Sequence, residues 1–313
     1  MMDFEEFSET ILKEVRKKTE GMFDVSITVN MKNNGIHCTG ISAIAKERNN
    51  GPCIYLDGYY KEYGNGSIEL YCIADKVYRQ IMEHEDDLRD IDIMDFLNWN
   101  NIRCRIYAKL INADRNRELL KDIPHRMFLD LAVVYYAAVN VFDIQKTATI
   151  LIHNHHMSIW GEKEETLYQT ALLNMRSDCN PLIEDMQNIL KSFVPEVFDI
   201  WGKDSLFLNM GAYILTNCRK HYGAAEILDK NTLKEISDKI RNDYILLPSS
   251  VHEVIVLSAG QNMGYGELAE MVRQVNAEEV SAEEYLSDHV YVYNRMLPSK
   301  LKFLSPVQKR QIK

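Results

Sequence analysis

The sequence predicts an α+β fold with mixed, mainly antiparallel sheets and hairpins, packed by amphipathic helices and divided into as many as two subdomains. Residues 244–294 follow the pattern strand, turn, strand, glycine-rich loop, helix, strand. The Asn33-Asn34-Gly35 turn separates two alternating segments, and apolar residues recur at helical spacing elsewhere. We expect an N-terminal subdomain over residues 1–95, a larger α+β subdomain over residues 96–295, and a flexible basic tail over residues 296–313.

The first subdomain begins with an amphipathic helix, because apolar residues recur at helical spacing over residues 4–15. Alternating residues 25–31 predict a half-buried strand. The Asn33-Asn34-Gly35 turn then leads into a return strand over residues 36–45, since both Asn34 and Gly35 tolerate a positive φ. The apolar phase of the return strand shifts at Gly40, which predicts a bulge there.

A tyrosine-rich segment and a helix complete this subdomain. Tyr59, Tyr60 and Tyr63 lie among glycines, a composition suited to a partner interface and equally to a core. The helix is expected over residues 67–84. The acidic residues 83–95 then mark the boundary with the second subdomain.

The second subdomain is expected to begin with a strand over residues 102–110 that has one apolar and one basic face. Arg103, Arg105 and Lys109 form the basic face, and Arg115 and Arg117 follow it. Such a face binds phosphate or an acidic partner, or carries edge charges that discourage aggregation. Residues 128–139 and 147–153 then predict a hairpin, residues 163–175 a helix, and residues 180–198 a helical linker interrupted at Pro195.

Residues 150–158 read ILIHNHHMS. If they continue a strand, His153 and His155 point to the same side and have the spacing to share a metal ion, with His156 opposite. The string resembles the HNHP signature of RadC-like JAMM metalloproteins, a resemblance that implies zinc and a hydrolase. His156 stands in place of the proline, and Lys163 and Thr166 stand at the later serine and aspartate positions. The other interpretation is a polar strand end with solvated imidazoles.

The last folding unit contains a glycine loop before a helix, in the context of a phosphate-binding loop. Glu267 and Glu270 fall in the first helical turn, where carboxylates satisfy the helix dipole and repel a pyrophosphate. We therefore expect a plain turn and no cofactor. Ser281 and Glu284 form a capping box that starts a short final helix. No residue of the chain forms a recognisable catalytic set, so no catalytic residue is assigned.

Composition indicates a globular chain. Its 313 residues are 46% hydrophobic and 26% charged. No apolar run approaches the roughly 18–20 residues of a membrane span, and no basic segment followed by an apolar one opens the chain. The six cysteines are scattered, without a Cys-x-x-Cys motif, which favours free buried thiols. We expect a cytoplasmic protein with no membrane partner.

The charge is strongly acidic, with 36 basic and 46 acidic residues and a net charge of −10. Residues 295–313 carry only basic charges. An acidic body repels nucleic acid, so we do not expect it to bind nucleic acid. The basic tail is either a frayed terminus or a segment that contacts nucleic acid or a partner.

Several segments together resemble a known family. They include IPHRMFLDLAVVYY, AYILTNCRKHYGAAEIL, YILLPSSVHEVIVL and EMVRQVNAEEVSAEEYLSDHVYVYNR. They are similar to the domain-of-unknown-function family 5688 of Firmicutes and, more weakly, to domain of unknown function 1444. The resemblance extends from the first helix to Arg295. It implies no activity, cofactor or catalytic residue, but members on conjugative elements and prophages imply an accessory role.

The leading functional expectation is a cytoplasmic, non-enzymatic accessory or interaction protein of a mobile element or prophage that binds a protein partner. A metal-dependent hydrolase with zinc at His153 and His155 is the first alternative. An acidic mimic of nucleic acid, which would occupy a DNA-binding protein, is the second.

Overall fold

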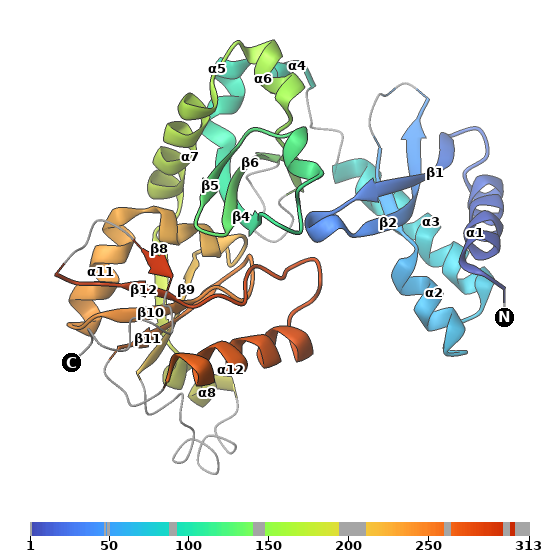
Figure 1. Cartoon of the computed structure of the whole chain (residues 1–313). Coiled ribbons are helices and arrows are strands. Elements are labelled where there is room, and N and C mark those ends of the chain that lie inside the picture. Colours follow the sequence, from blue (N-terminus) through green and yellow to red (C-terminus); the bar gives the residue numbers. More distant parts are fainter. Residues whose placement is uncertain are drawn as a thin grey trace. The chain divides into compact units, whose positions relative to one another are not determined.

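The structure is a computed structural model that describes residues 2–46, 48, 51–87, 93–139, 148–193, 211–259, 264–296 and 301–303. These residues form an α+β fold in which the strands pair into antiparallel sheets (Figure 1). The chain divides into two compact units, Met1–Ile93 and Met94–Lys313. The sequence-based boundary at residue 95 falls beside this division.

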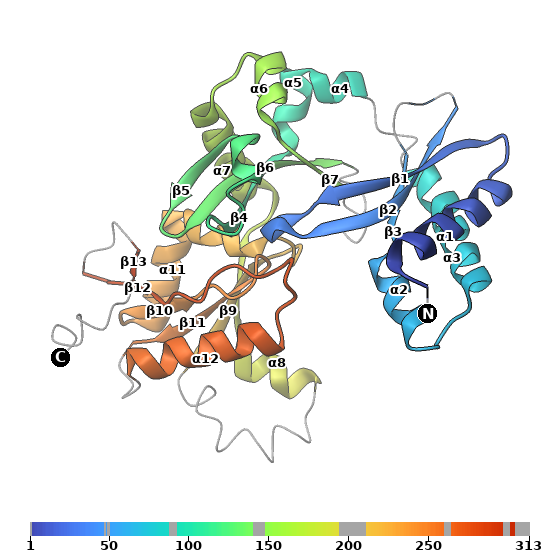
Figure 2. The same cartoon turned by 45° about the vertical axis from the view of Figure 1, so that its right-hand side comes forward.

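Unit 1 is a three-stranded sheet covered by helices. The sheet order is β1-β2-β3, and α1 and α3 pack against it around a core that includes Phe7, Ile11, Ile41 and Val77 (Figure 2). The elements are α1 (Phe4–Lys18), β1 (Phe23–Met31), η1 (Asn33–Gly35), β2 (His37–Ala45), β3 (Cys53–Tyr55), α2 (Asp57–Gly64) and α3 (Leu70–Asp87). Asp3 caps α1 by accepting a hydrogen bond from the Glu6 backbone N–H.

The β1–β2 hairpin confirms the predicted turn and corrects the predicted bulge. Asn34 and Gly35 have φ values of 61° and 69°, as the turn requires. The register then runs without interruption, with Gly40 opposite Thr28. Gly40 is small for another reason: a Cβ there would lie 2.6 Å from the Cys53 Sγ of the neighbouring strand β3. The shift in apolar phase therefore marks a close approach of β3, not an extra residue.

Unit 2 contains two sheets. One has the order β4-β6-β5 with β7 paired to β6, and the other has the order β13-β12-β10-β11-β9-β8. The elements are α4 (Ile93–Leu97), α5 (Trp99–Ile102), η2 (Arg103–Arg105), β4 (Ile106–Asn112), η3 (Leu119–Lys121), β5 (His125–Phe128), β6 (Leu131–Val139), β7 (Ala148–Leu151), α6 (Asn154–Trp160), α7 (Glu164–Asp178), β8 (Pro181–Asp185), α8 (Met186–Phe193), β9 (Ala212–Asn217), η4 (Gly223–Leu228), α11 (Lys230–Ile240), β10 (Tyr244–Leu247), β11 (Val254–Ser258), α12 (Tyr265–Glu278), β12 (Tyr291–Tyr293) and β13 (Lys302–Phe303).

The six-stranded sheet of unit 2 is covered on both faces. Strand residues alternate, so Leu247 and Leu257 face α12, whereas Leu246 and Val256 belong to the core that includes α11 (Figure 1). The predicted β6–β7 hairpin and the predicted helix α7 are confirmed by the structure.

Three predicted elements of unit 2 are wrong in part. The predicted strand over residues 102–110 is present from Ile106 onward, but Arg103 and Arg105 lie in η2, because Asn174 binds the carbonyl oxygens of Arg103 and Ile106 and delays the start of β4. The predicted helical linker is helical over Met186–Phe193, which is α8, but residues 181–185 form an edge strand paired with β9. The segment after Ser281 is a turn, in which the Ser281 Oγ still accepts a hydrogen bond from the Glu284 N–H.

The cysteine prediction is wrong for one pair. Cys179 and Cys218 form a disulfide, with their Cα atoms 5.6 Å apart, whereas Cys53, Cys72 and Cys104 are free thiols. Their wide sequence separation hid the pair, which the β8–β9 pairing brings together.

Two further expectations concern the tail and the membrane. Leu301 is buried, and Lys302–Phe303 forms β13 against β12, but most of the basic tail lies outside the described residues. Among the helices that the structure describes, none combines the length and apolar character needed to cross a membrane.

Candidate functional site

The predicted histidine pair does not lie on a strand. β7 ends at Leu151, and His153 is the N-cap of α6, so His155 and His156 belong to the first helical turn. The ring centroids of His153 and His155 lie 5.6 Å apart, and those of His155 and His156 lie 3.8 Å apart. The strand-based argument for a shared ligand direction therefore fails, although the three imidazoles do gather.

The contacts of these imidazoles are those of a helix start. His153 Nδ1 lies 2.7 Å from the Asp122 carboxylate, and the His153 backbone N–H donates to His156 Nδ1 at 3.0 Å. His156 also stacks on Trp160, and burial beside the other two histidines lowers its pKa to about 4. Within the residues that the structure describes, no three His, Cys, Asp or Glu side chains converge as a metal ion requires. A zinc ion held by His153 and His155 would therefore have two imidazole ligands and no converging third ligand among the described residues.

The tyrosines chosen from the sequence lie on α2 and pack on the core of unit 1. Tyr60 contacts the rings of Phe4 and Phe7, with centroids 5.0 and 5.2 Å away, and Tyr63 contacts Phe7 at 5.5 Å. The Tyr59 hydroxyl donates to Gln80 on α3. These contacts fix α2 to the helices beside it.

Of the basic residues chosen from the sequence, Lys109 lies in a second cluster of aromatic and titratable side chains. It projects from β4, while Arg103 and Arg105 lie in the preceding η2. We call this cluster the tyrosine–histidine site; it consists of Tyr107, Lys109, Tyr136, Arg219, His221, Tyr222, Glu226 and His252.

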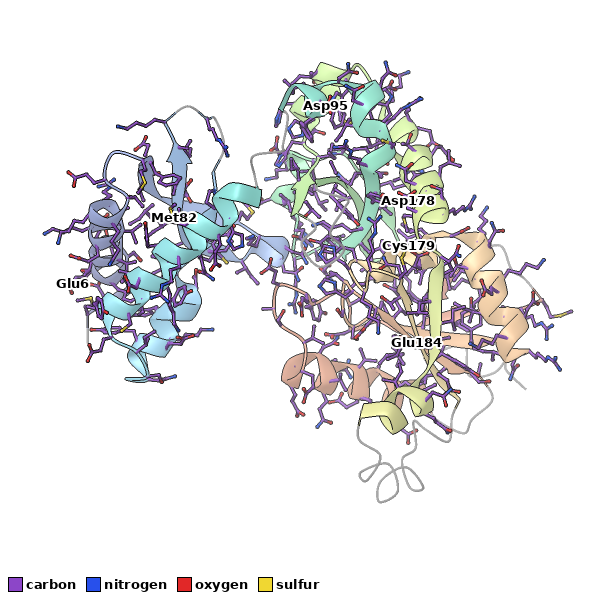
Figure 3. All side chains as sticks on the ribbon, turned by 180° about the vertical axis from the view of Figure 1, so that it is seen from behind. Glu6, Met82, Asp95, Asp178, Cys179 and Glu184 are labelled. Carbon is purple, nitrogen blue, oxygen red and sulfur yellow. A yellow bond between two sulfur atoms is a disulfide. The ribbon has the colours of Figure 1, made fainter. Side chains whose placement is uncertain are left out.

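A cross-strand tyrosine pair forms the floor of the site. Tyr107 on β4 lies directly opposite Tyr136 on β6, and their rings stack with centroids 5.7 Å apart. Both rings are almost fully buried. The Tyr107 hydroxyl donates to the carboxylate of Asp178, the last residue of α7 (Figure 3), and burial followed by this bond raises the pKa of Tyr107 to about 12. The pair therefore remains protonated at neutral pH.

The loop between β9 and η4 carries Arg219, His221 and Tyr222 of the site, and hydrogen bonds to the Asn217 side chain hold its backbone. The Asn217 side chain accepts hydrogen bonds from the backbone N–H groups of Arg219 and His221 and donates to the His221 carbonyl at 2.9 Å. Lys220 and Tyr222 have φ values of 50° and 54°, a backbone conformation that residues other than glycine rarely adopt. Such backbone strain is concentrated at functional sites and persists only where the surrounding contacts enforce it.

Three rings of the site contact one another. Tyr222 and His252 are parallel to within 7° with centroids 5.5 Å apart, and His221 lies 5.3 Å from His252. His252 Nδ1 accepts a hydrogen bond from the Tyr222 N–H, which places the ring proton on Nε2, facing Glu284 at 3.5 Å. Tyr222 also contacts Tyr136 edge to face, which connects this loop to the Tyr107–Tyr136 pair.

Two cations of the site lie close to aromatic rings. The Lys109 ammonium lies 4.6 Å from the centre of the Tyr222 ring, and the Arg219 guanidinium lies 5.0 Å from that of Tyr107. Neither cation forms a salt bridge with any carboxylate of the described segments. By contrast, carboxylates pair with Arg126 and Arg176 elsewhere in unit 2.

Two neighbouring groups are held in their uncharged forms. Glu226 is 4% exposed, and burial followed by the nearby Asp229 charge raises its pKa from 4.5 to about 8. Burial, with His252, Lys109 and Arg219 adding repulsion, lowers the pKa of His221 from 6.5 to about 4. At neutral pH the site therefore presents two cations, tyrosine rings, a neutral imidazole and a protonated carboxyl group.

A serine, a histidine and an aspartate also meet near β12, but they do not form a catalytic triad. The Ser287 Oγ and the His289 Nδ1 both contact the same Asp130 oxygen, at 2.6 and 2.9 Å. A triad needs the aspartate on one ring nitrogen and the serine on the other. Ser287 is also fully buried, and Tyr291 donates to the same carboxylate. This cluster ties the β5–β6 turn to the loop before β12.

Comparison with protein families gives a match over most of the chain. The model described as a family of unknown function, DUF5688, matches residues 4–295. The chain belongs to this family. Neither the curated proteins nor the solved structures provide a match. The family region contains every residue of the tyrosine–histidine site and of the histidine cluster on α6.

Sequence reasoning identified only Lys109 of the tyrosine–histidine site. Its members come from β4, β6, the loop after β9 and the loop before β11, so no single window of sequence contains them. The segment RKHYG at residues 219–223 was the available signal, because it sets two cations, a histidine and a tyrosine directly before a glycine.

Proposed function

We propose that this protein is a non-enzymatic interaction protein that captures an acidic segment of a protein partner at the tyrosine–histidine site. One observation carries the proposal. In a chain with a net charge of −10, Lys109 and Arg219 lie over aromatic rings, and no carboxylate of the described residues forms a salt bridge with either. A carboxylate of a partner supplies the missing counter-charge.

The chemistry of the site supports this ligand class. A guanidinium binds a carboxylate through two parallel hydrogen bonds, and the Arg219 guanidinium is already placed 5.0 Å from the centre of the Tyr107 ring. Tyrosine and arginine also predominate among the residues that dominate binding energy at protein interfaces. The protonated Glu226 adds no negative charge that would repel the partner.

The proposed setting is the cytoplasm of a Firmicutes bacterium, on a mobile element or prophage. Membership of the family and the acidic composition are compatible with this setting. The acidic net charge repels nucleic acid. Lys109 and Arg219 give the tyrosine–histidine site a local positive charge that attracts an acidic partner.

The first test is the binding of a fluorescein-labelled oligoglutamate peptide to the full chain, with Arg219→Gln and Lys109→Met as the site variants. Each is expected to weaken binding about tenfold, the loss of one charge-assisted contact. Arg117→Gln is the matched control, because Arg117 is exposed and already paired with Asp114. Equal affinity of all four proteins would overturn the proposal, as would tighter binding of a phosphopeptide that has no acidic side chains.

Affinity capture from a lysate of the source cell then identifies the partner. A partner that wild type and Arg117→Gln retain and Arg219→Gln releases supports the site. A DNA-binding protein that all variants retain equally, and that moderate salt removes, favours the nucleic-acid mimic. One zinc ion per chain that disappears in His153→Ala would favour the metal-dependent hydrolase.

A further inference from the structure

We propose that the Cys179–Cys218 disulfide is a redox latch that holds the tyrosine–histidine site in its binding form. This inference rests on the proposed function, because it concerns the regulation of the same site. The disulfide connects the end of α7 to the end of β9, and both of its neighbours in sequence reach the floor of the site.

The neighbours of the disulfide converge on Tyr107. Asp178, which precedes Cys179 at the end of α7 (Figure 3), accepts the hydrogen bond of the Tyr107 hydroxyl, and Arg219, which follows Cys218, lies near the Tyr107 ring. The Cys218 N–H also donates to the Cys179 Sγ at 2.8 Å. The disulfide thus links the two chain segments that carry the anion and the cation in contact with Tyr107.

The segment beyond the disulfide is the strained one. Lys220 and Tyr222, both with positive φ, follow Cys218 within four residues. The β8–β9 ladder forms independently of the sulfur atoms, since Pro181 pairs with Asn217 through the backbone register. Breaking the disulfide therefore releases the loop and Arg219 while the sheet remains paired.

The disulfide is accessible to a reductant, because Cys218 is exposed and Cys179 is only half-buried. A dithiol reductant breaks the S–S bond by thiol–disulfide exchange. Cys179 and Cys218 each gain one electron and one proton, and the reductant closes its own disulfide. In a reducing compartment an accessible disulfide is typically a transient, regulatory one, which suits a latch more than a permanent staple.

The test compares oxidised wild type, wild type reduced with dithiothreitol, and the double variant Cys179→Ser/Cys218→Ser. The oligoglutamate probe is expected to bind the reduced protein and the double variant about tenfold more weakly than the oxidised protein. Cys104→Ser is the control, because Cys104 is an exposed free thiol outside the disulfide. Equal affinity in both redox states would overturn the latch.

A second measurement separates failure of the latch from failure of the proposed function. Reduction is expected to speed amide hydrogen exchange at His221 and Tyr222, whose N–H groups bond to Asn217 and His252, without changing exchange in β8 and β9. If exchange responds and the probe binds neither state, the latch stands as a conformational device and the acidic-partner proposal is wrong. Unchanged exchange at both residues would overturn the latch whatever the probe does.

Discussion

Two regions of unit 2 gather histidines, and they differ in what their neighbours do. At the start of α6, Asp122 binds His153, the His153 backbone binds His156, and His156 packs on Trp160. In the tyrosine–histidine site, the rings stack beside two cations that no described carboxylate neutralises. In the first region His153 and His156 bond to neighbouring groups of the fold, whereas the cations of the second region are the basis of the proposed binding site.

This difference shows why histidine spacing is a weak guide to chemistry. Three histidines within four residues attract attention in a sequence, yet their side chains here complete a helix start. His221 and His252, which are 31 positions apart along the chain, are in ring contact because strands β9 and β11 are neighbours in one sheet. The following predictions test how sharply the two regions differ.

The largest effect is expected from Gly223→Ala, which strikes the loop of the tyrosine–histidine site. A Cβ at this position would lie 2.3 Å from Thr216 Oγ1 and 2.7 Å from both the Asn217 nitrogen and the His252 carbonyl oxygen. Two of these atoms belong to the backbone and cannot move aside without distorting the chain around them. The free energy of unfolding should therefore fall by about 3 kcal/mol or more. Urea denaturation measures this change.

Gly266→Ala is the matched control, because it lies in the first turns of α12 with no atom within 4 Å of the added Cβ. It should leave stability unchanged or raise it by about 0.4–1 kcal/mol. If both variants behave alike, the close packing of the loop against His252 is wrong.

The second prediction concerns the pH dependence that Glu226 imposes. Its folded pKa of about 8 exceeds its ordinary value of 4.5, so the folded state binds the proton more tightly and stability is lost as the pH rises between these values. Glu226→Gln keeps the neutral shape and removes the titration. Between pH 5.5 and 7.5, wild type should lose on the order of 2–3 kcal/mol relative to the variant, at about 1.4 kcal/mol per pH unit. Parallel stability profiles would show that the carboxyl group is not buried.

Much of the fold follows from local patterns. The Asn33-Asn34-Gly35 turn, the β6–β7 hairpin and helix α7, with Leu167, Ala171 and Met175 buried, all come from short-range signals that tertiary contacts reinforce. The errors occur where a distant group overrides the local pattern. Asn174 binds the backbone around Arg103, and β9 recruits residues 181–185 as a strand.

The site was harder to predict than the fold, for a physical reason. Lys109 is recognisable as a cation from the sequence. That it lies over Tyr222 and forms no salt bridge with a described carboxylate depends on how the core is assembled. The same holds for Glu226, which is an ordinary acidic residue in the sequence. Only its burial raises its pKa so that the carboxyl group keeps its proton at neutral pH. No periodicity or spacing in one sequence encodes either property.

The third prediction addresses the acid side of the stability profile, where the two regions act alike. The pKa values of His156 and His221 are both lowered from 6.5 to about 4, so each imidazole is neutral when folded and charged when unfolded between these values. Their contribution to stability is present above pH 6.5 and is lost as the pH falls toward 4. With Glu226 acting in the opposite sense, stability should be greatest near pH 6.5.

His156→Phe keeps an aromatic ring against Trp160 and Phe96 but removes the titration. Its stability should fall less than that of wild type between pH 6.5 and pH 4.5, with a smaller difference than Glu226→Gln gives on the alkaline side. Chemical denaturation at the two pH values measures the slope. A slope equal to that of wild type would mean that His156 is solvated when folded.

The smallest effect is expected at His153, and it decides what the α6 cluster is for. If His153 is a helix-capping residue, His153→Ala removes the contact with Asp122 and lowers stability by about 0.5–1 kcal/mol. His153→Asn, which places a preferred capping side chain at the same position, should restore most of that loss, and neither variant should change binding of the oligoglutamate probe. Asparagine lacks an imidazole, so it cannot restore a metal site. Recovery of stability with asparagine therefore assigns the cluster to the fold, whereas a loss shared by both variants, together with lost zinc, would move the functional centre from the tyrosine–histidine site to the start of α6.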